Sequence, residues 1–238
     1  MRPNRRHVLM AGAVAAVSTV AAAESATAAD LYGSGQLGDW TILSRAISTE
    51  ATVKYVRDND GVYMFGDSIS VQDGKALASQ LISRTGKSIA VHNWSGRPTA
   101  PAVDALQSWA IKYGLPRRIL MATGTNDIFN PPVFAAQVDR TMKIAGSGRT
   151  VVWVNVQIAR VAKSAAIQLA DQRNGAWINS QLSDAQKKYP NLRIVRWAES
   201  LAAKPSNLTT YLREGVHTSV PAGQTARNDL ILQALIAP

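Results

Sequence analysis

Residues 61–70 of the chain read GVYMFGDSIS, an apolar run that ends in Gly66, Asp67 and Ser68. An uncharged apolar run of this length is typical of a strand that is buried on both faces of a sheet. Gly, Asp and Ser are also common turn residues, so the tripeptide alone is more typical of a turn than of a catalytic site. The stretch therefore predicts a strand over residues 61–65 and leaves two interpretations of Ser68, a turn residue or a nucleophile.

The same alternation of apolar runs and amphipathic stretches continues along the chain. It predicts four further strands, over residues 88–94, 118–122, 150–158 and 192–197. It also predicts five helices: one capped by Asp73 and ended by Gly86, one over 99–113, one opened by Asn130 and Pro131, one over 165–188 and one over 221–236. Buried strands separated by helices indicate a parallel sheet covered on both faces. The predicted fold class is α/β, a three-layer α/β/α sandwich with a mostly parallel five-stranded sheet.

Polar residues follow the carboxyl ends of these predicted strands, where the functional loops of such sheets lie. Gly96 comes shortly after the second strand, residues 124–127 read GTND after the third, and a late loop carries Glu214 and His217. An acyl-transfer enzyme needs a nucleophile, a base, a group that orients the base, and hydrogen-bond donors for the oxyanion. The strand ends offer a candidate for each requirement.

In this order, the blocks at Ser68, Gly96, Asn126 and His217 resemble the four sequence blocks of the SGNH/GDSL hydrolase family, over about residues 61–236. The resemblance implies a flavodoxin-like arrangement, with Ser68 as nucleophile and His217 as base. It also implies an oxyanion hole built from the backbone amides of Ser68 and Gly96 and the side chain of Asn126. The family usually has Asp three residues before the histidine, where this chain has Glu214. A Ser-His-Glu triad and a Ser-His dyad therefore both remain open.

Each block also has a purely structural interpretation. Asn126 or Asp127 would serve equally as a helix cap, and Glu214 with His217 as an exposed pair. The occurrence of four blocks in order, each at a predicted loop, favours the catalytic interpretation. The α/β-hydrolases share the order Ser, acid, His, but their nucleophile follows several strands, whereas Ser68 follows the first predicted strand.

Histidines are scarce in the chain, because only His92 and His217 follow the first 28 residues. His92 falls within the second predicted strand, where a packed or backbone-bonded role is expected, so His217 is the expected base. The chain has no cysteine, and zinc sites usually draw on several His or Cys ligands. We therefore predict no metal and no cofactor.

Residues 1–28 have the pattern of an export signal. Arginines at positions 2, 5 and 6 precede an apolar stretch over 8–23 and a small-residue site that ends at Ala28. That stretch is shorter than the roughly 20 residues that span a bilayer, so we expect cleavage near Ala28 rather than a stable membrane anchor. The adjacent Arg5 and Arg6 resemble a bacterial twin-arginine signal. The predicted organisation is a signal peptide over 1–28, an N-terminal extension over 29–60 and a hydrolase domain over 61–238, in a secreted or cell-envelope protein.

The chain is basic, with 26 Lys and Arg against 16 Asp and Glu and a formal net charge of +10. This balance favours anionic or envelope partners. The basic residues are scattered rather than gathered in a tract or a helical stripe, which argues against nucleic acid as a partner.

Together these features predict an exported serine esterase or deacylase that acts on a small-molecule or glycan-linked carboxylic ester. No long apolar insertion interrupts the predicted helices, so we expect a small acyl group. Trp94, Arg97 and Ile128 adjoin the blocks and are the expected walls of the substrate site. Two alternatives are an O-acyltransferase that acts on an envelope glycan with the same site, and an inactive glycan-binding module. All four blocks are filled, which disfavours the inactive module.

Overall fold

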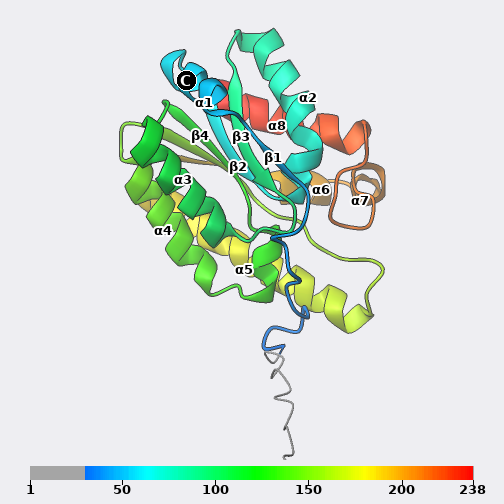
Figure 1. The fold of residues 1–238 in the computed structure, drawn as a ribbon. Helices are drawn as coiled ribbons and strands as arrows, with labels where there is room; N and C mark the ends of the chain where they lie inside the picture. Colours follow the sequence, from blue (N-terminus) through cyan, green and yellow to red (C-terminus); the bar gives the residue numbers. More distant parts are fainter. Residues whose placement is uncertain (1–29, 238) are drawn as a thin grey trace, which may run out of the picture.

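The computed structural model describes residues 30–237, which form one six-stranded sheet with helices on both faces (Figure 1). The strand order is β1-β3-β2-β4-β5-β6. Strands β2 to β6 are parallel, and β1 runs antiparallel to β3 at the edge. The predicted α/β/α sandwich with a mostly parallel sheet is therefore confirmed.

All five predicted strands are present. They are β2 (Val62–Gly66), β3 (Ile89–Trp94), β4 (Arg118–Ala122), β5 (Thr150–Val154) and β6 (Leu192–Val195). Strand β5 ends four residues before its predicted end. The reason is that the backbone of Val156 pairs with a side chain instead of a strand: its N–H donates to Asn179 Oδ1 (2.9 Å) and its carbonyl accepts from Asn179 Nδ2 (2.8 Å).

The prediction of five strands is wrong by one, because β1 (Arg45–Ile47) adds an edge strand. This strand has only three residues, none of them buried, so it carries no apolar pattern that a sequence could reveal. Helix α1 (Glu50–Asp58) follows it and buries Val53 and Val56. Both elements belong to the stretch that the sequence analysis treated as an N-terminal extension.

Alternate residues of β2 divide the core into two layers. Tyr63 and Phe65 pack with α1, α3 (Thr99–Tyr113), α4 (Val133–Ala145) and α5 (Ala165–Lys188). Val62 and Met64 pack with α2 (Ser68–Thr85), α6 (Trp197–Ala202) and α8 (Ala222–Ile236) on the opposite face. Successive strand side chains point to opposite faces, so a strand buried on both faces is apolar throughout. Figure 1 shows the two helix layers on either side of the sheet.

Two predicted helix starts are wrong. Helix α2 begins at Ser68 with Asp67 as its N-cap, so Asp73 lies inside the helix, where it is buried. Helix α4 begins at Val133 rather than at Asn130 and Pro131, because the 3₁₀ helix η1 (Thr125–Phe129) occupies the preceding turn. Helix α7 (Pro205–Tyr211) was not predicted. Among residues 30–237, no helix has both the length and the apolar character to cross a bilayer.

Candidate active site

The structure brings Ser68, His217 and Glu214 together beyond the carboxyl end of β2. Ser68 Oγ lies 2.8 Å from His217 Nε2, and the other ring nitrogen, Nδ1, contacts Glu214 Oε1. The three side chains border a pocket of about 180 Å³ with Asn126 and Ile128. A hydroxyl, an imidazole and a carboxylate joined in this order form the arrangement that activates a serine nucleophile.

Ser68 is the first residue of α2, directly after the strand. The carboxylate of Asp67 caps the helix by accepting from Ile69 N at 3.0 Å. The first amides of a helix have no partner within it, and the positive end of the helix dipole lies there. The Ser68 amide is therefore placed where it favours negative charge on a bound group.

The loop that carries His217 is tied to α2 through Asp73. Thr218 Oγ1 donates to this buried carboxylate, at 3.0 Å from Oδ1 and 2.9 Å from Oδ2, and Gln72 Nε2 donates to Thr218 Oγ1 at 2.7 Å. Asp73 lies one and a half turns after Ser68 on the same helix. This explains why a residue that looked like a helix cap is buried within a helix: it holds the histidine loop against the helix that carries the serine.

Glu214 occupies the position expected of a triad acid. Its Oε1 accepts from the backbone N–H of His217 at 3.2 Å as well as contacting the ring. Partial burial opposes ionisation of this carboxyl, but the hydrogen bonds from His217 outweigh burial and hold the pKa of Glu214 below its ordinary value. A carboxylate that stays ionised against the ring stabilises an imidazolium and holds the tautomer that leaves Nε2 free to accept a proton.

The residues expected to form the oxyanion hole come from three neighbouring strand ends. Gly96 has φ = 73°, and a Cβ there would lie 2.9 Å from the Cβ of Trp40, so both the backbone conformation and the close packing require glycine. Asn126 lies in η1, where its Nδ2 donates to the carbonyl of Arg97 at 3.3 Å. That hydrogen bond uses one of the two amide hydrogens and fixes Asn126 beside the Gly96 loop.

Arg97 does not line the pocket as expected, because its side chain is 1% exposed. It points under the site, where Nη2 donates to Gly66 O at 2.9 Å and Nη1 lies 2.7 Å from His92 Nδ1. Burial lowers the pKa of Arg97 to about 10. Arg97 thus joins the strand end before Ser68 to the Gly96 loop, and the expectation that it contacts substrate is corrected.

The other two expected wall residues differ in their placement. Ile128 borders the pocket and is buried. Trp94 packs edge-on against Trp40, with ring centroids 5.1 Å apart, and its ring lies under the guanidinium of Arg45 at 4.8 Å. Trp94 is not among the residues that border the pocket.

His92 has the structural role expected of a strand histidine. It stacks on Phe65 and meets Trp109 edge-on, with ring centroids 6.2 Å and 5.7 Å apart. Burial, reinforced by the Arg97 guanidinium, lowers the pKa of His92 to about 4. The ring is therefore neutral near pH 7, and Nδ1 accepts from Arg97.

Asp127 has the capping role that the sequence left open for it. Its carboxylate accepts from the Thr99 amide at 3.0 Å and the Thr99 hydroxyl at 2.7 Å, at the start of α3. Burial raises the pKa of Asp127 to about 6, although both hydrogen bonds oppose this shift. Asp127 thereby fixes η1, and with it Asn126, against α3.

Several pocket residues were not predicted: Thr125, Phe129, Ile158, Arg160 and Val216. Ile158 is the last residue of the fourth predicted strand and Arg160 follows it, so the strand-end rule that identified the other blocks could have found them. Their residue types carry no catalytic signal, which is why sequence reasoning omitted them. Within residues 30–237, no group of three or more His, Asp or Glu residues is placed to hold a metal ion.

Comparisons with known proteins support the fold. No family model and no curated protein matches the sequence, whereas many solved structures match the fold. One is the C-terminal catalytic domain of peptidoglycan O-acetyltransferase A from Streptococcus pneumoniae, at 21% identity and a TM-score of 0.59, covering 74% of this chain and 92% of that one.

Two further neighbours carry hydrolase names. A GDSL-like lipase from Bacteroides thetaiotaomicron has 16% identity and a TM-score of 0.60, covering 80% of this chain and 91% of that one. A lipase/acylhydrolase from Enterococcus faecalis has 18% identity and a TM-score of 0.57, covering 73% and 93%. The chain therefore has the fold of the SGNH/GDSL hydrolases, the family that its four sequence blocks resemble.

Proposed function

We propose that the protein is a serine esterase or deacylase that hydrolyses a carboxylic ester through an acyl-enzyme. The observation that carries this proposal is the contact chain from Glu214 through His217 to Ser68 Oγ, which ends in a pocket bordered by Asn126. It supplies a nucleophile, a base, an orienting acid and an oxyanion donor within one site.

In the first half-reaction, Ser68 Oγ attacks the ester carbonyl carbon as its proton passes to His217 Nε2. The carbonyl oxygen becomes an oxyanion, which the Ser68 and Gly96 amides and Asn126 Nδ2 stabilise. The bond between the carbonyl carbon and the ester oxygen then breaks, and the leaving oxygen takes the proton from Nε2. In the second half, water attacks the acyl-enzyme, gives a proton to His217 and releases the acid, and Ser68 regains its proton.

A second candidate is transfer of the acyl group to a sugar hydroxyl in place of water. It is favoured by the likeness to a structure named as a peptidoglycan O-acetyltransferase, and by the basic composition of the chain. The chemistry at Ser68 is the same for both acceptors. The predicted export signal over residues 1–28, which lies outside the described residues, would place either enzyme in the cell envelope or outside the cell.

The test uses nitrophenyl esters and a phosphonate ester probe. We expect the wild type to hydrolyse the esters, with the probe attached to Ser68, and the Ser68→Ala variant to lose at least about 10³-fold in kcat/KM. Adding a soluble oligosaccharide acceptor separates the two candidates, because a transferase would form an acylated sugar.

Ser70→Ala is a matched control on the same helix. Ser70 Oγ is buried and has no hydrogen-bond partner among the described residues, so its removal should leave turnover within about twofold. If mass spectrometry found the phosphonate probe attached to a serine other than Ser68, the proposal would be refuted.

A further inference from the structure

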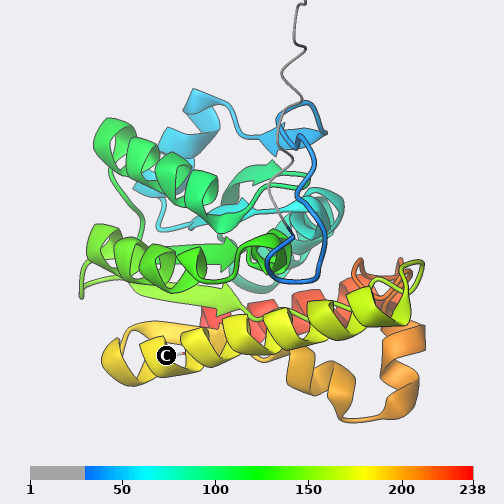
Figure 2. The same cartoon turned by 90° about the horizontal axis from the view of Figure 1, so that it is seen from below.

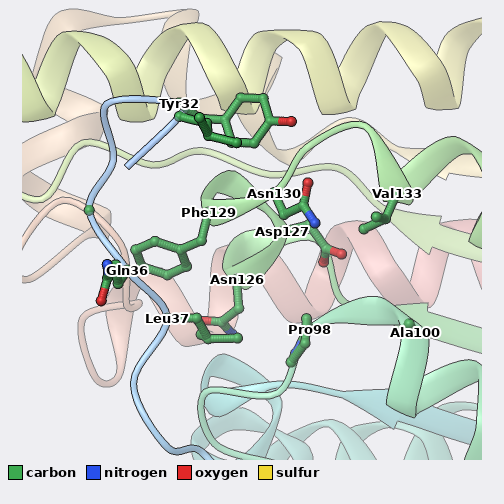
Figure 3. A pocket seen from close by; sticks show the side chains of 12 residues that line it. Tyr32, Gln36, Leu37, Pro98, Ala100, Asn126, Asp127, Phe129, Asn130 and Val133 are labelled. Atoms are coloured by element: carbon green, nitrogen blue, oxygen red, sulfur yellow. The ribbon is translucent and has the colours of Figure 1, made fainter. Parts of the chain in front are cut away.

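A second and larger cavity lies beside the catalytic pocket. It has a volume of about 460 Å³ and shares Asn126 and Phe129 with the smaller pocket at Ser68. Its walls are mainly apolar: Leu31, Tyr32 and Leu37 on one side and Pro98, Ala100 and Val133 on the other. Figure 3 shows the labelled members of both walls around the cavity, with Asn126 and Phe129 near its centre.

One wall is supplied by residues 30–40, a segment without regular secondary structure that we call the N-terminal strap. Asn174 and Arg173 of α5 hold it by donating to Tyr32 O at 3.0 Å and 2.7 Å, and Asn174 also bonds Ser34 Oγ at 3.0 Å. Gly33 has φ = 75°, and a Cβ there would lie 3.0 Å from Ala170 Cβ. Figure 2 shows the strap beside α5. The strap is therefore held against α5 by hydrogen bonds and by close packing at Gly33.

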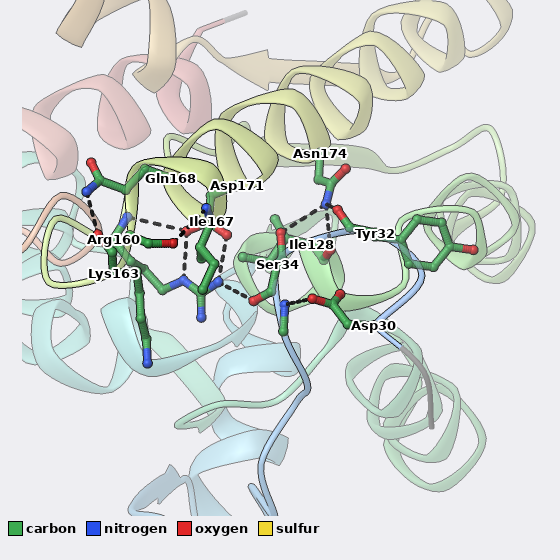
Figure 4. Close-up of polar contacts among 12 residues, drawn as sticks. Asp30, Tyr32, Ser34, Ile128, Arg160, Lys163, Ile167, Gln168, Asp171 and Asn174 are labelled. Carbon is green, nitrogen blue, oxygen red and sulfur yellow. Dashed lines mark hydrogen bonds and ion pairs between the residues drawn. The ribbon is translucent and has the colours of Figure 1, made fainter. Parts of the chain in front are cut away.

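The strap is also connected to the catalytic pocket through Arg160. This side chain borders the pocket at Ser68, and its Nη2 donates to the carbonyl of the buried Ser34. The buried carboxylate of Asp171 orients it, with Arg160 Nε at 2.7 Å from Oδ2 (Figure 4). The guanidinium lies 5.1 Å from the ring centre of Phe129, which together with Asn126 borders both cavities. One cation thus fixes the strap and the wall between the cavities.

The chemistry at Ser68 decides which part of an ester can reach the larger cavity. The leaving oxygen must lie at His217 Nε2, which protonates it, and the carbonyl oxygen must face Asn126. The larger cavity is bordered by Asn126 but by none of Ser68, Glu214 and His217. The substituent that extends past Asn126, away from the histidine, is the acyl group.

We propose that the larger cavity is a binding subsite for a medium-length acyl chain, with the N-terminal strap as its outer wall. This inference rests on the proposed esterase function. Pockets that enclose small ligands have volumes of roughly 300–1,000 Å³, a range that includes the larger cavity but not the pocket at Ser68. This proposal replaces the expectation of a small acyl group. That expectation was based on the lack of long insertions between the predicted helices, and it did not include a wall formed by the strap.

The test is an acyl-length series of nitrophenyl esters from acetyl to octanoyl. For the wild type, kcat/KM should rise by up to about fourfold per methylene that leaves water. Ala100→Phe, which fills the cavity, should lower kcat/KM for the octanoyl ester at least tenfold and leave the acetyl ester within twofold. Ser108→Phe, at an exposed position of the same helix, should change neither ester. A flat wild-type series, or equal losses for both esters, would overturn the subsite.

A second pair of variants tests the strap itself. Gly33→Val should lift the strap from α5 and lower the preference for octanoyl over acetyl at least tenfold, since a side chain there meets Ala170. Gly38 lies in the same segment, and a Cβ there would meet open space. Gly38→Val should therefore retain the preference for octanoyl over acetyl. An unchanged preference in Gly33→Val would remove the strap from the subsite.

A binding measurement makes the inference independent of turnover. Sodium octanoate should bind the Ser68→Ala variant in calorimetry, and adding Ala100→Phe should weaken its affinity at least tenfold. If octanoate binds in this way but no ester is hydrolysed by the wild type, the proposed function fails and the subsite stands. If esters are hydrolysed but octanoate does not bind, or binds equally to both variants, the subsite fails.

Discussion

Residues 30–237 contain two histidines, His92 and His217, and the two differ in the charge of the partner that each ring contacts. At His217 one ring nitrogen contacts the carboxylate of Glu214 and the other lies 2.8 Å from a serine hydroxyl. At His92 the ring nitrogen Nδ1 lies 2.7 Å from the guanidinium of Arg97, Phe65 stacks on the ring and Trp109 meets it edge-on.

This difference in charge separates a base from a structural residue. A carboxylate stabilises the imidazolium that forms when a base takes a proton, whereas a guanidinium opposes it. His92 is kept neutral by burial and by Arg97, and it packs against Phe65 and Trp109. The predictions below test this contrast, in order of decreasing effect.

The largest effect is expected from removing the two imidazoles in turn. His217→Ala should lower kcat for a nitrophenyl ester by roughly 10⁴-fold or more, because Ser68 loses its proton acceptor. His92→Gln, which keeps an acceptor for Arg97, should stay within about fivefold. Thermal midpoints of both variants serve as the folding control. A larger kcat loss in the folded His92 variant would reverse the assignment of the base.

A smaller loss is expected when the partner of His217 changes its charge. Glu214→Gln keeps the size of the side chain but can donate to the ring and favour the wrong tautomer, so kcat should fall by roughly 10² to 10⁴. Glu214→Ala should give a comparable loss. Steady-state kinetics on both variants decide between triad and dyad: a loss below about fivefold in both would show that Ser68 and His217 act without Glu214.

The smallest effect concerns stability at the second site. Because the pKa of His92 is about 4 in the fold and near 6.5 as a free side chain, the unfolded chain binds a proton between these values and the fold does not. The free energy of unfolding should therefore fall as pH decreases from 6.5 to 4, by on the order of 2 kcal/mol after allowance for partial exposure.

The His92→Gln variant lacks this contribution. Urea unfolding of both proteins at pH 7 and pH 4.5 measures it as a difference, in which the titration of the common carboxylates cancels. The wild type should lose more stability than the variant on acidification. Equal pH dependence of the two proteins would mean that His92 is not held neutral by its surroundings.

The sequence by itself determined the parallel sheet, because five mainly apolar runs separated by amphipathic stretches are typical of strands connected by helices. It also determined the set of polar residues at the strand ends. Ser68 and Asn126 meet in the structure because the carboxyl ends of parallel strands share one edge. The loop that carries Glu214 and His217 follows α7, and the hydrogen bonds of Thr218 to Asp73 hold it against the helix of Ser68. Edge strand β1 was not predicted, because its three residues are not buried and show no apolar pattern.

Only the tertiary structure decided which way individual side chains point and which part of the fold the strap covers. Arg97 follows Gly96, yet it points inward because Gly66 O and His92 offer acceptors there. Asp73 is of a residue type that often caps helices, but it is buried against Thr218, which lies 145 residues away in the sequence. A hydrogen bond from Arg160 to the carbonyl of Ser34 holds the strap, although the two residues are 126 positions apart in the sequence. Local periodicity carries information over a few residues, whereas these contacts exist only after the sheet has brought distant segments together.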